Sequence, residues 1–191
     1  MLDQMSGARR LLLVGVLMMF AFGCGQRRSG DVNPHEMVRD LAAWFAEETA
    51  LLLPAGSRLV IWAADPPPSA RGAIRVGESV SKALKAKGFE VVMESHEWPE
   101  APLLDTAALR ELQSRHGPLA AVVSTAAGIA LDEPPAHGQP RVLVLATGPD
   151  LGYETLVRKG HVALAIVPIS AAAQNASARE VRERFRVLKS P

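Results

Sequence analysis

The sequence has one cysteine, few aromatic side chains and almost no net charge, and each shortage argues against a class of function. A single cysteine, Cys24, cannot form a disulfide within the chain, so an exported form of this protein needs another use for its thiol. Aromatic residues make up 5% of the 191 residues, and the formal net charge is +1. Proteins that bind nucleic acid usually carry a basic patch and aromatic stacking platforms, so we expect no nucleic-acid partner.

Motifs that accompany many enzymes and metal sites are also missing. Three prolines follow the first predicted strand, in DPPP, where a glycine-rich phosphate-binding loop would stand. Ser124 ends a strand in VVSTAAG but lacks the flanking glycines of a nucleophile elbow. The nearest approach to a ligand cluster is His96 with Glu94 and Glu97, for which a solvated strand end is the simpler interpretation. We therefore expect no cofactor and no metal, and rank a hydrolase-like enzyme third among the functions.

The clearest pattern in the sequence is an export signal. Arg9 and Arg10 precede an apolar run, residues 11–22, of about 12 residues, whereas a transmembrane helix needs about 20. A basic start, a short apolar run and small residues at its end are typical of a secretory signal. We therefore expect a signal peptide at 1–23, a polar tether at 24–33 and a single α/β domain at 34–191.

The end of this run, AFGC, resembles the lipobox of bacterial lipoproteins. In that family the cysteine thiol receives a diacylglyceryl group, and the signal is then cleaved before the cysteine. The resemblance implies that Cys24 carries a lipid that tethers the protein to the periplasmic face of a membrane. Gly25 after the cysteine favours the outer membrane in a diderm cell. Two alternatives stay open, because Ala21 and Gly23 also suit ordinary signal cleavage and an uncleaved run would act as an anchor.

The rest of the chain alternates between short apolar runs and amphipathic helical patterns. Buried strands are predicted at 58–64, 89–93, 119–124, 142–146 and 161–167. Helices are predicted between Asn33 and Pro54, at 69–87, 105–116 and 151–159, and after the capping box that begins at Ser177.

Strands that are apolar throughout are typical of a parallel sheet that helices cover on both faces. We therefore expect an α/β three-layer sandwich with a mostly parallel five-stranded sheet, Rossmann-like in the broad sense, with strand order 2-1-3-4-5. The connection at 125–140 contains too much proline and glycine for a full helix, so we expect an irregular crossover there.

Small polar side chains follow several predicted strands, at the edge where open α/β sheets bind their ligands. The candidates that this rule selects are Asp65, Ser69, Ser124, Thr125, Thr147 and Asp150. The same residue types also make loops and helix caps, which is the simpler interpretation of each one. A small-molecule site at this edge is therefore our second hypothesis for the function.

The strand pattern, with the glycine-led strand at 160–168, loosely resembles one lobe of the type I periplasmic binding proteins. That family binds its ligand between two lobes, and this chain has residues for one, so the resemblance does not extend to that mode of ligand capture. Together with the export signal, the sequence predicts a membrane-tethered periplasmic lipoprotein. We expect it to act as a non-enzymatic interaction or transport-accessory module beside an envelope or transporter protein.

Overall fold

The computed structural model describes residues 33–66, 73–97, 103–125, 128–147, 152–169 and 181–190. The predicted signal peptide, Cys24 and nearly all of the tether lie outside these residues, as do Ser69 and Asp150.

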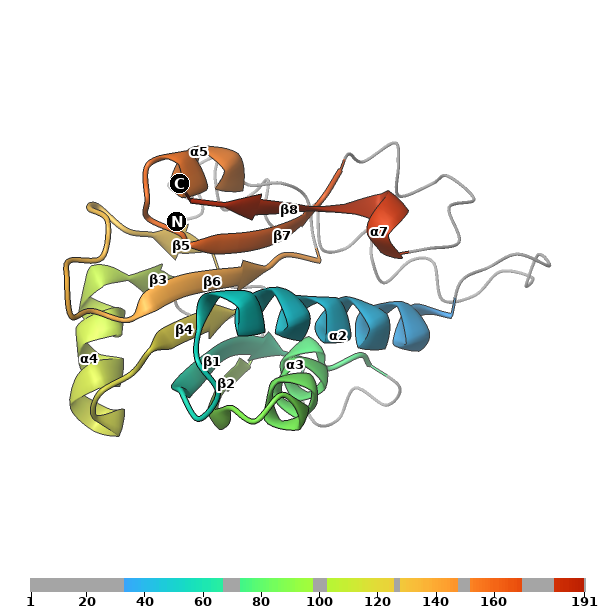
Figure 1. The fold of residues 1–191 in the computed structure, drawn as a ribbon, viewed down its shortest axis with the longest axis horizontal. Coiled ribbons are helices and arrows are strands. Elements are labelled where there is room, and N and C mark those ends of the chain that lie inside the picture. The colour runs from blue at the N-terminus through green and yellow to red at the C-terminus, as the bar shows by residue number, and fades with distance from the viewer. Residues whose placement is uncertain are drawn as a thin grey trace, which may run out of the picture. The chain divides into compact units, whose positions relative to one another are not determined.

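The described residues form three layers, with a mostly parallel sheet between two layers of helices (Figure 1). The six-stranded sheet has the order β2-β1-β4-β6-β7-β8. Its strands are β1 (Arg58–Asp65), β2 (Glu90–Glu97), β4 (Ala121–Ser124), β6 (Arg141–Leu145), β7 (Leu164–Pro168) and β8 (Phe185–Lys189). The helices are α2 (Pro34–Leu52), α3 (Val76–Ala86), α4 (Thr106–His116), α5 (Tyr153–Arg158) and α7 (Val181–Arg184). Two short strands, β3 (Leu104–Asp105) and β5 (Ile129–Ala130), pair separately.

The predicted fold class is confirmed. The five predicted strands correspond to β1, β2, β4, β6 and β7, which pair in parallel in the predicted order 2-1-3-4-5. The first helix begins as its sequence indicates, because the Asn33 side chain accepts a hydrogen bond from the His35 amide at 3.1 Å and Pro34 stands at the first helical position. The crossover between β4 and β6 is irregular where it is described, apart from β5.

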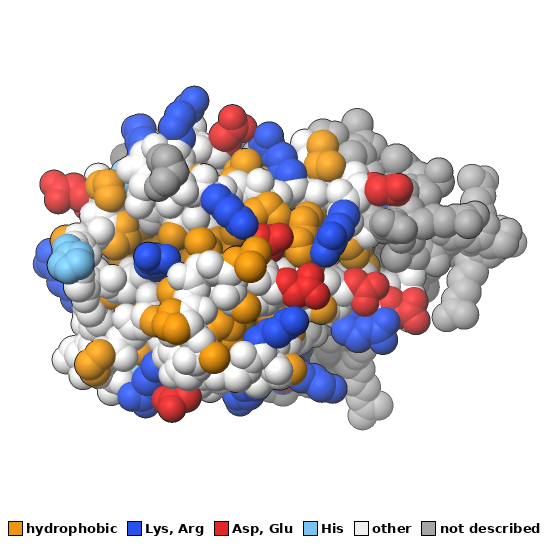
Figure 2. All heavy atoms as spheres, in the orientation of Figure 1, with side chains coloured by type: hydrophobic (Ala, Val, Ile, Leu, Met, Phe, Trp, Pro, Cys, Tyr) orange, Lys and Arg blue, Asp and Glu red, His pale blue; other side chains and the backbone are white. Residues whose placement is uncertain are grey.

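Alternate residues of each strand enter two separate apolar cores, one on each face of the sheet. Leu59, Ile61 and Ala63 of β1 point into the core under α2 and α3, whereas Val60 and Trp62 point into the core under α4 and α5. Burial on both faces explains why the strands are apolar throughout. Figure 2 shows basic and acidic side chains interspersed on the surface over α2 and α3, as expected of a solvated face.

The predicted C-terminal helix is wrong after Arg184, and its start at Ser177 lies outside the described residues. The structure has the four-residue α7 and then β8, which runs antiparallel to β7. The expected helical stripe of Val181, Phe185 and Leu188 is too short to distinguish a helix from a strand. As a strand, residues 185–189 place Phe185 in one core and Leu188 against the other, and they pair the open edge of β7.

Side chains of α2 hold β8 in place. The Lys189 ammonium lies 2.7 Å from a Glu48 carboxylate oxygen, and the Trp44 indole N–H donates to the same carboxylate at 3.1 Å. Burial alone would raise the pKa of Glu48, but these two hydrogen bonds outweigh it and hold the pKa below its ordinary value. The Arg182 guanidinium also lies 5.4 Å from the Trp44 ring centre, so α7 contacts the same helix.

Glu94 links strand β2 to the last turn of α4. One carboxylate oxygen lies 2.5 Å from His116 Nε2, and Arg115 donates to the other at 2.6 Å. Burial alone would raise the pKa of Glu94, but the hydrogen bonds from His116 and Arg115 outweigh it and lower the pKa. Glu94 therefore has a structural partner and does not form a ligand cluster with His96.

We predict that Glu94→Gln destabilises the protein at neutral pH by about 1–3 kcal/mol, because it removes a charge-assisted hydrogen-bond acceptor. The lowered pKa means that Glu94 stabilises the fold above its ordinary value of 4.5, and that this stabilisation is lost as the pH falls through the lower folded value. Urea unfolding at about pH 7 and about pH 3 should show the difference from the parent protein shrinking in acid. Glu90→Gln, at an exposed position of the same strand, is the matched control. A difference that is equal at both pH values would contradict this prediction.

Candidate functional site

Five parallel strands bring their carboxyl ends to one edge of the sheet. Ser124 is the last residue of β4, Thr125 follows it directly, and Thr147 lies just beyond β6. The structure thus places these three candidates on neighbouring strands at the same edge. Asp65 is the last residue of β1, but its side chain lies outside the described part of the chain, like Ser69 and Asp150.

Thr125 lies buried at the centre of this edge. Its amide donates to the carbonyl of Trp62 at 3.2 Å, which continues the β1–β4 pairing by one residue and fixes the backbone. The residue is only 1% exposed, yet its hydroxyl oxygen has no hydrogen-bond partner in the structure. A buried hydroxyl without a partner costs about 1–3 kcal/mol, so a hydrogen bond to the Thr125 hydroxyl would be favourable.

His96 presents a second unpaired polar atom at the end of β2, two strands from Thr125. It pairs in register with Ala64, and its ring centre lies 4.1 Å from that of Trp62, with the planes tilted by 48°. This contact with a buried indole holds the imidazole in place. The Nε2 atom is buried and has no hydrogen-bond partner.

Ser124 and Thr147 complete the described part of this edge. Ser124 is fully buried and in register with Trp62 on one side and Val144 on the other, so it shares the face of the sheet that carries Trp62. Thr147 is half-buried. We call the group of Trp62, His96, Ser124, Thr125 and Thr147 the strand-end site. Within it, Thr125 alternates with Ser124 along the chain and so lies toward the α2 and α3 face of the sheet, whereas His96 lies on the face that carries Trp62.

Sequence reasoning selected the hydroxyl residues but missed the part played by His96 and Trp62. It treated His96 as a metal-ligand candidate with Glu94 and Glu97, whereas Glu94 is bound to α4. In the sequence, only the position of His96 could have indicated its role. It stands near the carboxyl end of a predicted strand, next to the strand that carries Trp62. The contact between the two rings depends on strand order and register, which periodicity does not report.

The strand-end site can bind polar groups, but its described residues lack the arrangement of a nucleophilic enzyme. An activated threonine needs a base within hydrogen-bond reach, and the Thr125 hydroxyl has no such partner among the residues that the structure describes. Across the described ranges, no three His, Cys, Asp or Glu side chains come together as metal ligands. A neutral imidazole nitrogen and a hydroxyl can instead donate or accept hydrogen bonds, which suits a ligand with hydroxyl or carbonyl groups.

None of the helices in the described part of the chain combines the length and the apolar character needed to cross a bilayer.

Comparison with known proteins identifies the fold but no family. No protein-family model matches the chain, and no curated protein matches it. Among solved structures, the XylFII molecule is 15% identical over 81% of this chain and 61% of its own, with a TM-score of 0.54. AraP, an arabinose binding protein from Geobacillus stearothermophilus, is 12% identical over 80% of this chain and 60% of its own, with a TM-score of 0.50.

A periplasmic ribose ABC transporter structure from Conexibacter woesei DSM 14684 is 18% identical over 68% of this chain, with a TM-score of 0.47. This chain spans 44% of that structure, and about 60% of the other two. At these identities the likeness shows the fold alone: the described layers resemble a lobe of the periplasmic sugar-binding proteins.

We predict that Thr125→Val raises the free energy of unfolding by about 1 kcal/mol, because it removes a buried hydroxyl that has no partner. Thr49→Val is the matched control. Thr49 is equally buried, but its hydroxyl donates to the Phe45 carbonyl at 2.8 Å, so its replacement should not stabilise the protein. Urea unfolding without added ligand measures both effects. A loss of stability in Thr125→Val would show that the hydroxyl has a partner in solution.

Proposed function

We propose that this protein is an exported, membrane-tethered and non-enzymatic binding module that serves a transport or envelope system. In this proposal the strand-end site holds a small polar ligand. The observation that carries the proposal is the pair of buried, unpaired polar atoms, Thr125 Oγ1 and His96 Nε2, at the carboxyl ends of the sheet. Natural proteins satisfy nearly all buried polar groups, and the exceptions usually have a functional reason.

The ligand that best suits this edge carries several hydroxyl groups. Each hydroxyl both donates and accepts, so different hydroxyls of one ligand can pair with an imidazole nitrogen and with a threonine hydroxyl. The predicted loop residues Asp65, Ser69 and Asp150 would add carboxylate and hydroxyl groups to those of Ser124 and Thr147. Proteins with a similar fold include an arabinose binding protein, which makes pentoses and related sugars the first ligands to test.

A second candidate function is the docking of a protein partner on the same edge. Ile169 follows the carboxyl end of β7 and is 46% exposed, and Leu103 precedes β3 and is 53% exposed. Leu103 also lies against Gly128, a residue of the segment that follows β4. Exposed large apolar side chains are typical of protein contacts, and a transport-accessory module needs a surface of this kind.

The proposed location rests on the N-terminal sequence and on the fold. Export would place the domain in the periplasm, where proteins of similar fold such as the ribose transporter component act. Lipidation of Cys24 would hold it at a membrane, the outer membrane in a diderm cell.

We predict that the mature protein begins at Cys24, with a diacylglyceryl group on the thiol and an acylated amino terminus. Mass spectrometry of the N-terminal peptide, from protein extracted from membranes, measures the modification. The control is Cys24→Ser, which should keep residues 1–23 because cleavage follows lipid attachment. An unmodified Cys24, or a mature terminus elsewhere, would contradict the tether and leave the strand-end site to be judged separately.

We predict that a pentose raises the melting temperature of the purified full chain by about 5 °C when its concentration is about 100 times Kd. Arabinose, ribose and xylose are the first probes, with glycerol at equal concentration as the reference. His96→Phe and Thr125→Val should remove the shift because they remove the two unpaired polar atoms. Thr49→Val, whose hydroxyl is already paired with the Phe45 carbonyl within α2, should keep it. An equal shift in all variants would place the ligand elsewhere, and no shift with any sugar would favour the protein-docking function.

A further inference from the structure

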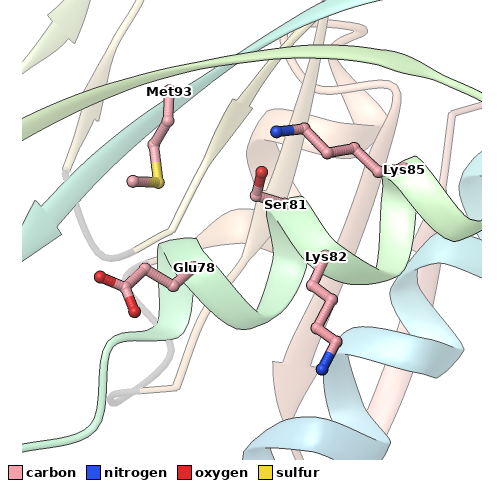
Figure 3. A pocket seen from close by; sticks show the side chains of 5 residues that line it. All are labelled: Glu78, Ser81, Lys82, Lys85 and Met93. Atoms are coloured by element: carbon pink, nitrogen blue, oxygen red, sulfur yellow. The ribbon is translucent and has the colours of Figure 1, made fainter.

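Within the described residues, no strand pairs with the outer side of the edge strand β2, and a hollow lies beside it. β2 is the first strand in the order of the sheet and pairs with β1 along all eight of its residues. Met93, in its middle, is 40% exposed. The hollow is lined by Met93 and by four residues of α3: Glu78, Ser81, Lys82 and Lys85 (Figure 3).

Edge strands usually carry features that prevent pairing with another chain, such as proline, inward lysine or a bulge. β2 reads EVVMESHE and contains neither proline nor lysine, and the charge in its middle, Glu94, is bound to α4. Its register with β1 is continuous, so no bulge interrupts it. The backbone of β2 is therefore a regular template on which a further strand can pair.

The charges on the α3 stripe beside β2 would complement those of a second copy of the same stripe placed antiparallel to it. Glu78, Ser81, Lys82 and Lys85 have the spacing of one helical stripe, with an acid at one end and a base at the other. Lys85 stands seven positions after Glu78, a rise of about 10.5 Å along the helix, so the two charges cannot pair within one helix. Lys85 takes part in none of the ion pairs of the described residues, and its side chain points toward the side of Met93, whereas that of Lys82 points away from it (Figure 3).

We propose that β2 is a self-association surface, on which a second copy of this chain adds its own β2 in antiparallel register. A two-fold axis would pass through Met93 and continue the sheet from one protomer into the other. The α3 helices would then run antiparallel on the same face, and Glu78 of each protomer would meet the partner's Lys85. This surface is independent of the strand-end site and of any ligand there.

Three features of β2 and α3 agree with a single axis. Met93 faces the middle of the Glu78–Lys85 stripe, so an axis at Met93 also passes near Ser81, which is small and nearly buried. α3 packs on both β1 and β2, and strands lie about 4.8 Å apart, so two such helices would lie about 10 Å apart, a normal packing distance. The register also places Glu90 opposite the partner's His96 rather than opposite another acid.

The surface charges allow this approach. Glu94, the other carboxylate in the middle of β2, is bound by Arg115 and His116 on the opposite face, so it adds little repulsion. Glu78 holds its own Arg75 at 2.9 Å, and the partner's Lys85 would share that carboxylate. An acidic peptide from another protein would use the same lysines, but it would not need the acid at the far end of the stripe.

A disulfide test reads out the register in the full chain within its membrane. Residues opposite each other in an antiparallel pair have Cα atoms about 4.5–5.5 Å apart, within disulfide range. Met93→Cys should therefore give a covalent dimer under mild oxidation. Ser95→Cys, on the same strand and exposed, would lie about 13 Å from its copy and should not. All variants keep Cys24, so the parent protein measures any dimer formed through that thiol.

A charge exchange tests the α3 contact by sedimentation of the detergent-extracted full chain. Lys85→Glu and Glu78→Lys should each weaken dimerisation about tenfold, because each replaces two attractive pairs by repulsive ones. The double variant should restore the parental dimer, which a structural defect would not do. A monomer at all concentrations, equal crosslinking at positions 93 and 95, or a double variant no better than the single ones would overturn the proposal.

Discussion

The parallel pairing of β1 with β2 on one side and β4 on the other is the constraint on which the rest of the molecule depends. Parallel neighbours need crossover connections, and the crossovers supply the helices that cover both faces of the sheet. Leu59 and Ile61 thus enter one core while Val60 and Trp62 enter the other. The same pairing delivers His96 and Thr125 to one edge on either side of β1, held by the Trp62 ring and by the Trp62 carbonyl.

The hydrophobic pattern of the sequence predicts those helices and strands whose conformation depends mainly on their own residues. The first helix could be predicted from Asn33 and Pro34, and the buried strands from their continuous apolar runs. The order of the five strands followed from the topology that parallel sheets prefer. Residues 185–189 could not be predicted in this way, because Phe185 and Leu188 fit both periods and only the open edge of β7 decides between them.

The strand-end site was predictable only in part, for the same physical reason. The position of Ser124 and Thr125 follows from the end of a strand, which the sequence marks. That the Thr125 hydroxyl is unpaired depends on what surrounds it. The contact of His96 with the Trp62 ring depends on the alignment of two strands that a helix separates in the chain. Such contacts are tertiary, so no local pattern reports them.

The attachment of β8 to α2 has a consequence for the order in which the domain is assembled. Glu48 and Lys189 meet although 140 residues stand between them, and Phe185 belongs to the same core as Phe45. In a chain that crosses a membrane with its N-terminus first, α2 emerges early but lacks these partners until the strand after α7 has passed through. Contacts between such distant segments close large loops and form late in folding. The native core could therefore form only after nearly the whole chain had been translocated. Under the proposed export, the domain would therefore remain unlocked until its last strand has crossed the membrane.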